Sequence, residues 1–125
     1  MTKRFTARGR IESFRYAGRG ILLMLRTQHN AWVHAAATVL VIAAGVFFGL
    51  SASEWSLLIL AMMAVWTAEA LNTAVELLAD AASPDFHPLV EKAKDVAAGA
   101  VLISAIGSVI IGVFVLGPRV LAVLT

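Results

Sequence analysis

The stretch that most constrains the fold is a run of twenty residues, 31–50, in which His34 is the only side chain that can carry a charge. A helix of this length spans the roughly 30 Å hydrocarbon core of a bilayer. The 125-residue chain is 60% hydrophobic and only 14% charged, and a soluble domain of this size cannot bury so much apolar surface. The run therefore predicts a membrane-spanning helix. A cleaved signal peptide is the alternative, but the run is too long for one, and later apolar stretches still need a membrane.

Two further stretches predict spans at about 55–80 and 96–117, within a single domain, 1–125. Pro84 and Pro88 are expected to hold a loop after the second span, and residues 89–95 to lead into the third. Gly117-Pro118 is expected to end the third span. Small residues permit close helix contacts, so we expect such contacts at three glycines of this span, Gly99, Gly107 and Gly112.

The N-terminal segment predicts a surface helix over about 10–28, with the residues up to about Gly9 disordered. Arginines recur at helical spacing and form one stripe, beside which Ile11 and Phe14 begin an apolar stripe. Such a helix lies along a membrane surface. Gly18 and Gly20 weaken it and are candidates for a bend.

The connection at residues 51–54 is short enough for a tight turn. We expect Ser53 to cap the helix that follows and Trp55 to lie at the membrane interface. Seven of the ten Lys and Arg residues precede residue 27, and the 51–54 turn has none. The positive-inside rule then places the N-terminus and the 81–95 loop in the cytoplasm and the C-terminus outside. The expected location is the bacterial inner membrane.

The second predicted span carries acidic and amide side chains in its latter half. Glu69, Asn72, Glu76 and Asp80 are spaced i, i+3, i+7 and i+11, which places them within an arc of about 80° on a helix. We call these four residues the polar ladder. Charged groups inside a membrane are costly and mark functional sites. The ladder therefore predicts a path from the membrane interior to the cytoplasmic surface.

The ladder and Lys94-Asp95 could link a group at lipid depth to a water-soluble one. A carboxylate at membrane depth is a candidate general base for a hydroxyl group. Carboxylates nearer the surface can hold Mg²⁺ together with phosphate oxygens, and Lys94 beside Asp95 supplies a cation for phosphate. The chain has no Walker A or GxGxxG motif, so an ATP site must be built differently. The absence of cysteine excludes disulfides and thiol chemistry.

Two other classes of function remain open from the residues alone. A small proton-coupled transporter could use Glu69 as its proton carrier, and would show flux driven by a pH gradient without ATP. A non-catalytic subunit could assemble through the glycines of the third span, and would co-purify with a larger partner. The proline-bracketed loop and Lys94-Asp95 argue against the transporter.

The ladder sequence EALNTAVELLAD (69–80), followed by HPLVEKAKDVAAGAVL (87–102), closely resembles the prokaryotic diacylglycerol kinases and their undecaprenol kinase relatives. The FxYAxxG pattern at 14–20 and NxxxH at 30–34 also fit. The resemblance covers about residues 11–117 and implies an all-α membrane protein with three spans and a surface helix. It further implies a homotrimer whose composite sites transfer the γ-phosphate of MgATP to a lipid hydroxyl.

The resemblance also implies roles for individual residues. Glu69 is similar to the catalytic base, Glu76 and Gln28 occupy the metal-binding positions, and supporting positions fall on Asn30, His34 and Asp80. The residues implied to contact nucleotide are Arg10, Tyr16, Gln28, Asn72, Glu76, Asp85, Phe86, His87, Lys94 and Asp95.

One position departs from the family pattern. Relatives commonly place a second metal-binding glutamate just before the first span, where this chain has Gln28. An amide oxygen can coordinate Mg²⁺ without adding negative charge, and His29, Asn30 or His34 are candidates to compensate. As the acceptor, diacylglycerol is favoured as the broader family activity. Undecaprenol is the alternative, because the HPxxxxAKD loop and NxxxH resemble that side of the family.

Overall fold

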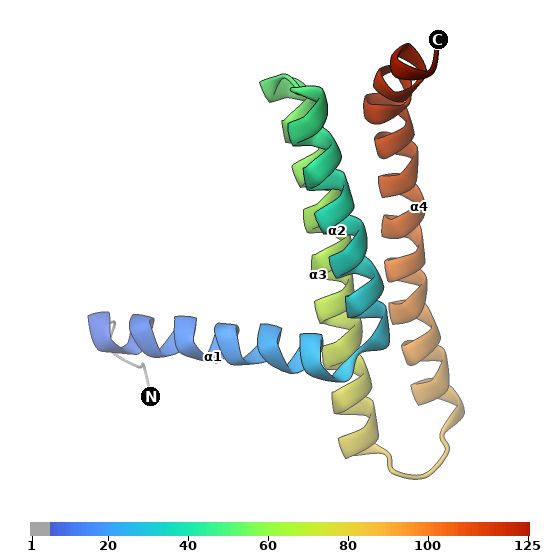
Figure 1. The fold of residues 1–125 in the computed structure, drawn as a ribbon. Helices are drawn as coiled ribbons and strands as arrows, with labels where there is room; N and C mark the ends of the chain where they lie inside the picture. Colours follow the sequence, from blue (N-terminus) through green and yellow to red (C-terminus); the bar gives the residue numbers. More distant parts are fainter. Residues whose placement is uncertain (1–5) are drawn as a thin grey trace.

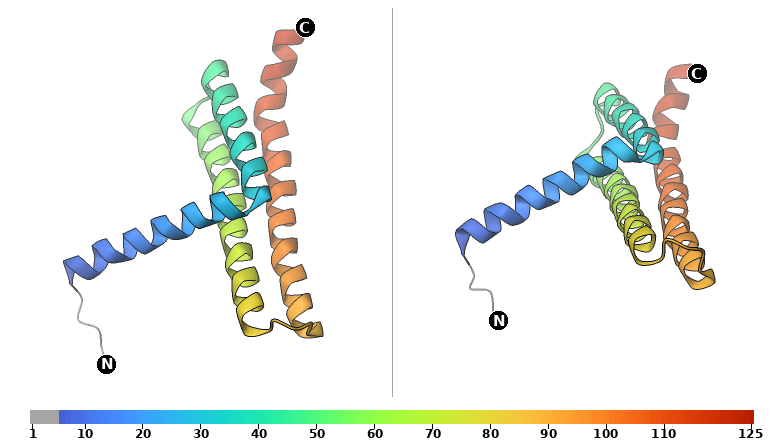
Figure 2. Two further views of the ribbon diagram at one scale, coloured as in Figure 1. Left: turned by 60° about the horizontal axis from the view of Figure 1, so that its bottom comes forward. Right: turned by 90° about the horizontal axis from the view of Figure 1, so that it is seen from below.

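The computed structural model describes residues 6–125, which form four helices. They are α1 (Ala7–Thr27), α2 (His29–Phe48), α3 (Ala52–Ala82) and α4 (Pro88–Leu124). Helices α2, α3 and α4 run side by side, and α1 extends away from them at a steep angle (Figures 1 and 2). The α1–α2 junction and the α3–α4 loop lie toward one end of the bundle, and the α2–α3 turn and the C-terminus lie at the other (Figure 1).

Three of these helices, α2, α3 and α4, are long and apolar enough to cross a membrane. Their apolar side chains are largely exposed, and the buried core is a small cluster of Leu50, Leu58 and Val115 near the α2–α3 turn. A chain that leaves so much apolar surface uncovered is suited to lipid rather than water. The prediction of an all-helical membrane protein with three spans and an N-terminal amphipathic helix is confirmed.

Helix α1 is longer and straighter than the sequence predicts. It begins at Ala7 because the Thr6 hydroxyl accepts a hydrogen bond from the Gly9 amide at 3.1 Å. The predicted disorder is therefore wrong for residues 7–9, whereas residues 1–5 lie outside the described part of the chain. The helix also continues without a break through Gly18 and Gly20, so the predicted bend is absent. Met24 is the one residue of α1 that is buried.

The turn between α2 and α3 depends on a different serine from the one predicted. Gly49 ends α2 in the left-handed conformation, at φ 63°, which glycine adopts without strain. Ser51, not Ser53, caps α3, because its hydroxyl accepts from the Glu54 amide while the Glu54 carboxylate accepts from the Ser51 amide. This reciprocal capping box satisfies two amide groups that the helix leaves unpaired.

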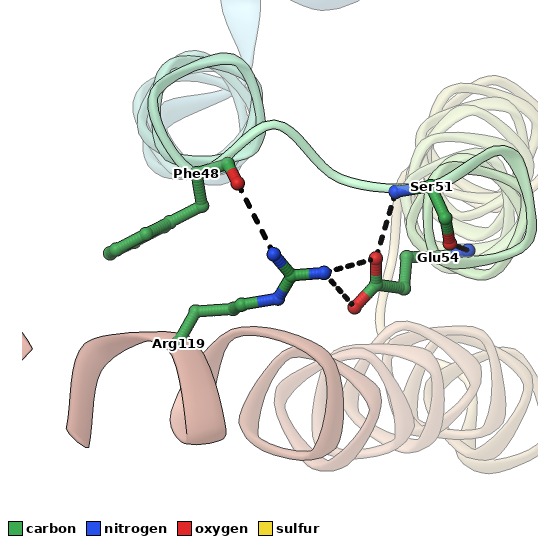
Figure 3. A network of polar contacts seen from close by, with 4 residues as sticks. All are labelled: Phe48, Ser51, Glu54 and Arg119. Atoms are coloured by element: carbon green, nitrogen blue, oxygen red, sulfur yellow. Dashed lines mark hydrogen bonds and ion pairs between the residues drawn. The ribbon is translucent and has the colours of Figure 1, made fainter. Parts of the chain in front are cut away.

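Helix α4 also exceeds its predicted bounds at both ends. Pro88 is already its first residue, and the helix continues through Pro118 to Leu124. The extension brings Arg119 back to the α2–α3 turn, where its guanidinium donates to the Phe48 carbonyl at 3.3 Å and to the Glu54 carboxylate at 2.9 Å (Figure 3). These contacts tie the end of α4 to the start of α3. The expectation that Gly117-Pro118 ends the helix is wrong.

The three glycines predicted to make close helix contacts do not make them in the described part of the chain. A methyl group added to Gly99, Gly107 or Gly112 would meet nothing within 4 Å. At Gly45 in α2, by contrast, an added methyl carbon would lie 2.5 Å from the indole ring of Trp55 in α3. In the α2–α3 hairpin, the Trp55 ring therefore packs directly against the backbone of Gly45.

Candidate functional site

The inner end of the polar ladder is buried among the helices. The exposed fraction is 0% for Glu69 and 5% for Asn72, whereas Glu76 is half-buried and Asp80 is exposed. The Asn72 amide nitrogen donates to a Glu76 carboxylate oxygen at 3.1 Å. The ladder therefore runs from a fully enclosed carboxylate to an exposed one, as the spacing predicted.

Glu69 has an unusual environment for an ionisable group. Neither of its carboxylate oxygens has a hydrogen-bond partner within the described residues, and the amide oxygen of Asn72 is unpaired as well. Thr73 donates to the Glu69 backbone carbonyl and leaves the carboxylate itself available. A buried polar group without a partner is costly. Such groups are expected where a substrate or ion supplies the missing contact.

The nearest ionisable group to Glu69 comes from α2. The Nε2 atom of His34 lies 3.6 Å from Glu69 Oε2. Next to it, the Trp66 indole nitrogen donates to the Thr38 hydroxyl at 3.0 Å, which joins α2 to α3. His34 was predicted only as a supporting residue, and its pairing with Glu69 was not predicted. The pairing could have been predicted because His34 and Glu69 are ionisable side chains in neighbouring apolar runs, and such groups commonly pair inside membranes.

Lys94 reaches the outer end of the ladder from α4. Its ammonium group pairs with the Asp80 carboxylate at 3.2 Å. The neighbouring Asp95 is exposed. Lys94 therefore places a cation at the exposed end of the ladder.

The α3–α4 loop contributes exposed side chains at the same end of the bundle. Asp85, Phe86 and His87 are all exposed. His87 also caps α4, because its Nδ1 atom accepts from the Leu89 amide at 3.2 Å. The loop is thus anchored at its end while its side chains remain accessible.

The α1 residues predicted to contact nucleotide are not brought to the ladder of the same chain. Arg10 and Tyr16 are exposed on the first half of α1, which extends away from the bundle (Figure 2). The Arg19 guanidinium lies 5.8 Å from the centre of the Tyr16 ring. A single chain therefore contains the whole ladder, but its Arg10 and Tyr16 lie away from that ladder.

The two predicted metal-binding residues, Gln28 and Glu76, are not brought together in the structure. Gln28 lies at the α1–α2 junction, where its amide donates to the Thr27 hydroxyl at 3.4 Å, and Asn30 is exposed. Across residues 6–125, no three His, Cys, Asp or Glu side chains gather as a metal site. The oxygens of Glu76 and Asn72 nevertheless suit Mg²⁺, which uses one or two carboxylates together with water and phosphate.

Two apolar hollows lie near the inner part of the ladder. An open groove of about 980 Å³ between α3 and α4 reaches Asn72 and Lys92. A smaller cavity of about 330 Å³, lined by α2, α3 and α4, reaches His34. The polar site therefore lies at the edge of surfaces suited to hydrocarbon.

The fold and site together define a small helical membrane protein whose carboxylates lie between a lipid-facing surface and an exposed loop. The family model described as prokaryotic diacylglycerol kinase matches residues 15–116, and the chain belongs to this family and is a lipid kinase. An undecaprenol kinase from Bacillus subtilis is 42% identical over 108 residues, covering 86% of this chain and 88% of that protein. A diacylglycerol kinase from Synechocystis is 40% identical over 113 residues, covering 90% of this chain and 65% of that protein.

Proposed function

We propose that the chain transfers the γ-phosphate of ATP to the hydroxyl of a membrane lipid, with Glu69 as the general base. The observation that carries this proposal is the fully buried Glu69 carboxylate, whose two oxygens have no partner within the described residues. A base must have a free lone pair facing the proton that it abstracts. Glu69 has this property, and it lies at the inner end of a ladder that leads to Lys94.

In the proposed reaction, a Glu69 oxygen takes the proton of the lipid hydroxyl while the hydroxyl oxygen attacks the γ-phosphorus. The bond between that phosphorus and the bridging oxygen breaks, and ADP leaves. Lys94 stabilises negative charge on the phosphates, because positioning and electrostatics provide most of the catalysis in phosphoryl transfer. Glu76 and Asn72 would hold Mg²⁺, which when bound neutralises charge on the phosphate oxygens.

For the acceptor, we favour undecaprenol over the diacylglycerol that the sequence alone favoured. The support is the undecaprenol kinase similarity, which covers most of both chains. The loop sequence beginning at His87-Pro88 points the same way. Diacylglycerol is the second candidate, supported by the similarity to the Synechocystis enzyme.

We also propose that the site is completed in a homo-oligomer, with three copies as the family resemblance implies. The support is the position of Arg10 and Tyr16 on the part of α1 that extends away from its own ladder (Figure 2). A neighbouring copy could supply these residues. The proposed orientation in the inner membrane keeps α1 and the α3–α4 loop in the cytoplasm, where ATP is available.

The test is phosphate transfer from [γ-³²P]ATP by the purified protein to undecaprenol and diacylglycerol in mixed micelles. We expect Glu69→Gln to lower kcat by about 10²- to 10⁴-fold, the usual contribution of a general base. Glu91→Gln is the matched control, because Glu91 is an exposed acidic residue outside the ladder. A Glu69→Gln variant with an unchanged rate rules out the assigned base, and a tenfold preference for diacylglycerol refutes the proposed acceptor.

A further inference from the structure

His34 and Glu69 face each other between α2 and α3 in the interior of the bundle. The Nε2–Oε2 distance is 3.6 Å, and the exposed fractions of the two side chains are 15% and 0%. Within residues 6–125, neither His34 Nε2 nor either Glu69 oxygen has a hydrogen-bond partner. Two complementary groups thus face each other, slightly beyond hydrogen-bond length, with no competitor for either.

The surroundings hold the imidazole in this position. The Trp66 ring meets the His34 ring edge-on, with 6.3 Å between centres and 71° between planes. Trp66 is itself fixed by its hydrogen bond to Thr38, one turn further along α2. Trp66 of α3 therefore packs against the imidazole, and Thr38 of α2 holds Trp66 in place.

The cavity that reaches His34 offers its Nε2 atom few hydrogen-bond acceptors other than Glu69. Its lining is apolar except for His34 and two hydroxyl residues, Thr38 and Ser108. The Thr38 hydroxyl already accepts from Trp66, and the Ser108 hydroxyl donates to the Ala61 carbonyl at 3.0 Å. Glu69 is thus the acceptor available to His34 Nε2.

We propose that His34 is a positioning residue for Glu69, an inference that rests on the proposed lipid kinase function. His34 donates its Nε2 proton to Glu69 Oε2, and this bond leaves Oε1 to take the proton of the lipid hydroxyl. His34 keeps its own proton throughout, and Glu69 carries the abstracted proton on Oε1. A movement of about 0.5 Å brings the pair within hydrogen-bond range, and such bonds commonly shorten when substrate binds.

This role differs from compensation for Gln28 in metal binding. A hydrogen bond to one oxygen stops an otherwise unpartnered carboxylate from rotating and from exchanging its two oxygens. Preorganised groups of this kind raise the rate because they need no rearrangement during the reaction. The expected signature is an effect on kcat with little effect on the KM for ATP.

The test compares two amide substitutions that differ by one methylene group. His34→Gln can place its amide nitrogen near the original Nε2 position, whereas His34→Asn is too short to reach Glu69. We expect His34→Asn to lower kcat by about 10- to 100-fold, as for loss of other orienting partners. We expect His34→Gln to restore most of the rate and the KM for ATP to remain within about twofold in both. Ser108→Ala is the control for a purely structural effect, because it removes a polar group from the same cavity without contacting Glu69.

The contact can also be followed without turnover. The infrared carboxyl band of Glu69, assigned by its loss in Glu69→Gln, should shift in His34→Asn and return toward its original frequency in His34→Gln. An active wild type with an unimpaired His34→Asn variant, or with equal loss in both variants, overturns the positioning role alone. A wild type that phosphorylates no lipid overturns the proposed function and the positioning role with it.

Discussion

Replacing Gly45 with alanine should destabilise the α2–α3 hairpin, although alanine is the better helix former. The new methyl carbon would lie 2.5, 2.7 and 3.1 Å from three atoms of the Trp55 ring. Carbon atoms normally rest about 3.5–4.0 Å apart, so the ring must retreat by roughly 1 Å. The indole is rigid, and Trp55 lies in the first turn of α3, which the Ser51 capping box fixes.

The expected magnitude is a balance of two terms. Overpacking of this kind costs about 1–3 kcal/mol, whereas replacing a helical glycine with alanine contributes up to ~1 kcal/mol of stability. The net loss in the free energy of unfolding should be about 0–2 kcal/mol relative to the wild type and about 1–3 kcal/mol relative to a glycine-to-alanine change without the clash. Gly107→Ala is the matched control, because an added methyl group there meets nothing within 4 Å and only the favourable term applies.

The assay is equilibrium unfolding in mixed detergent micelles, followed by far-UV circular dichroism. The double variant Gly45→Ala/Trp55→Phe should recover stability relative to the sum of its single changes, with a coupling energy of about 1 kcal/mol or more. If Gly45→Ala is as stable as Gly107→Ala, or if the coupling is zero, the Gly45–Trp55 contact does not hold the hairpin as argued.

Two further predictions concern the opposite ends of the bundle. Glu54→Ala should lower the unfolding midpoint more than Arg119→Gln, because Glu54 takes part in both the capping box and the ion pair, and neither change should alter the kinase rate per folded molecule (Figure 3). Unfolding and activity assays on the same samples check this, and a larger effect of Arg119→Gln contradicts it. Removing Mg²⁺ with a chelator should abolish transfer, and Glu76→Gln and Asn72→Ala should each raise the Mg²⁺ concentration needed for the half-maximal rate, because the first removes the charge of a proposed ligand and the second removes a proposed ligand oxygen. A Mg²⁺ titration of the rate that is unchanged in both variants rules out these ligands.

Features that depend on local helix geometry followed from the sequence. The three spans and the common face of the polar ladder were both predictable from composition and residue spacing. Hydrogen bonding within a helix fixes which residues share a face, whatever the helix packs against. Even the position of Asn72 beside Glu76 follows from their i, i+4 separation.

Contacts between helices were decided only by the tertiary structure. The pairing of His34 with Glu69, and of Arg119 with Glu54, joins residues that are 35 and 65 positions apart. Each depends on the rotation of one helix about its axis relative to another, which side-chain packing sets and residue spacing does not. The same reason explains why the close glycine is Gly45, against Trp55, rather than any of the three in α4.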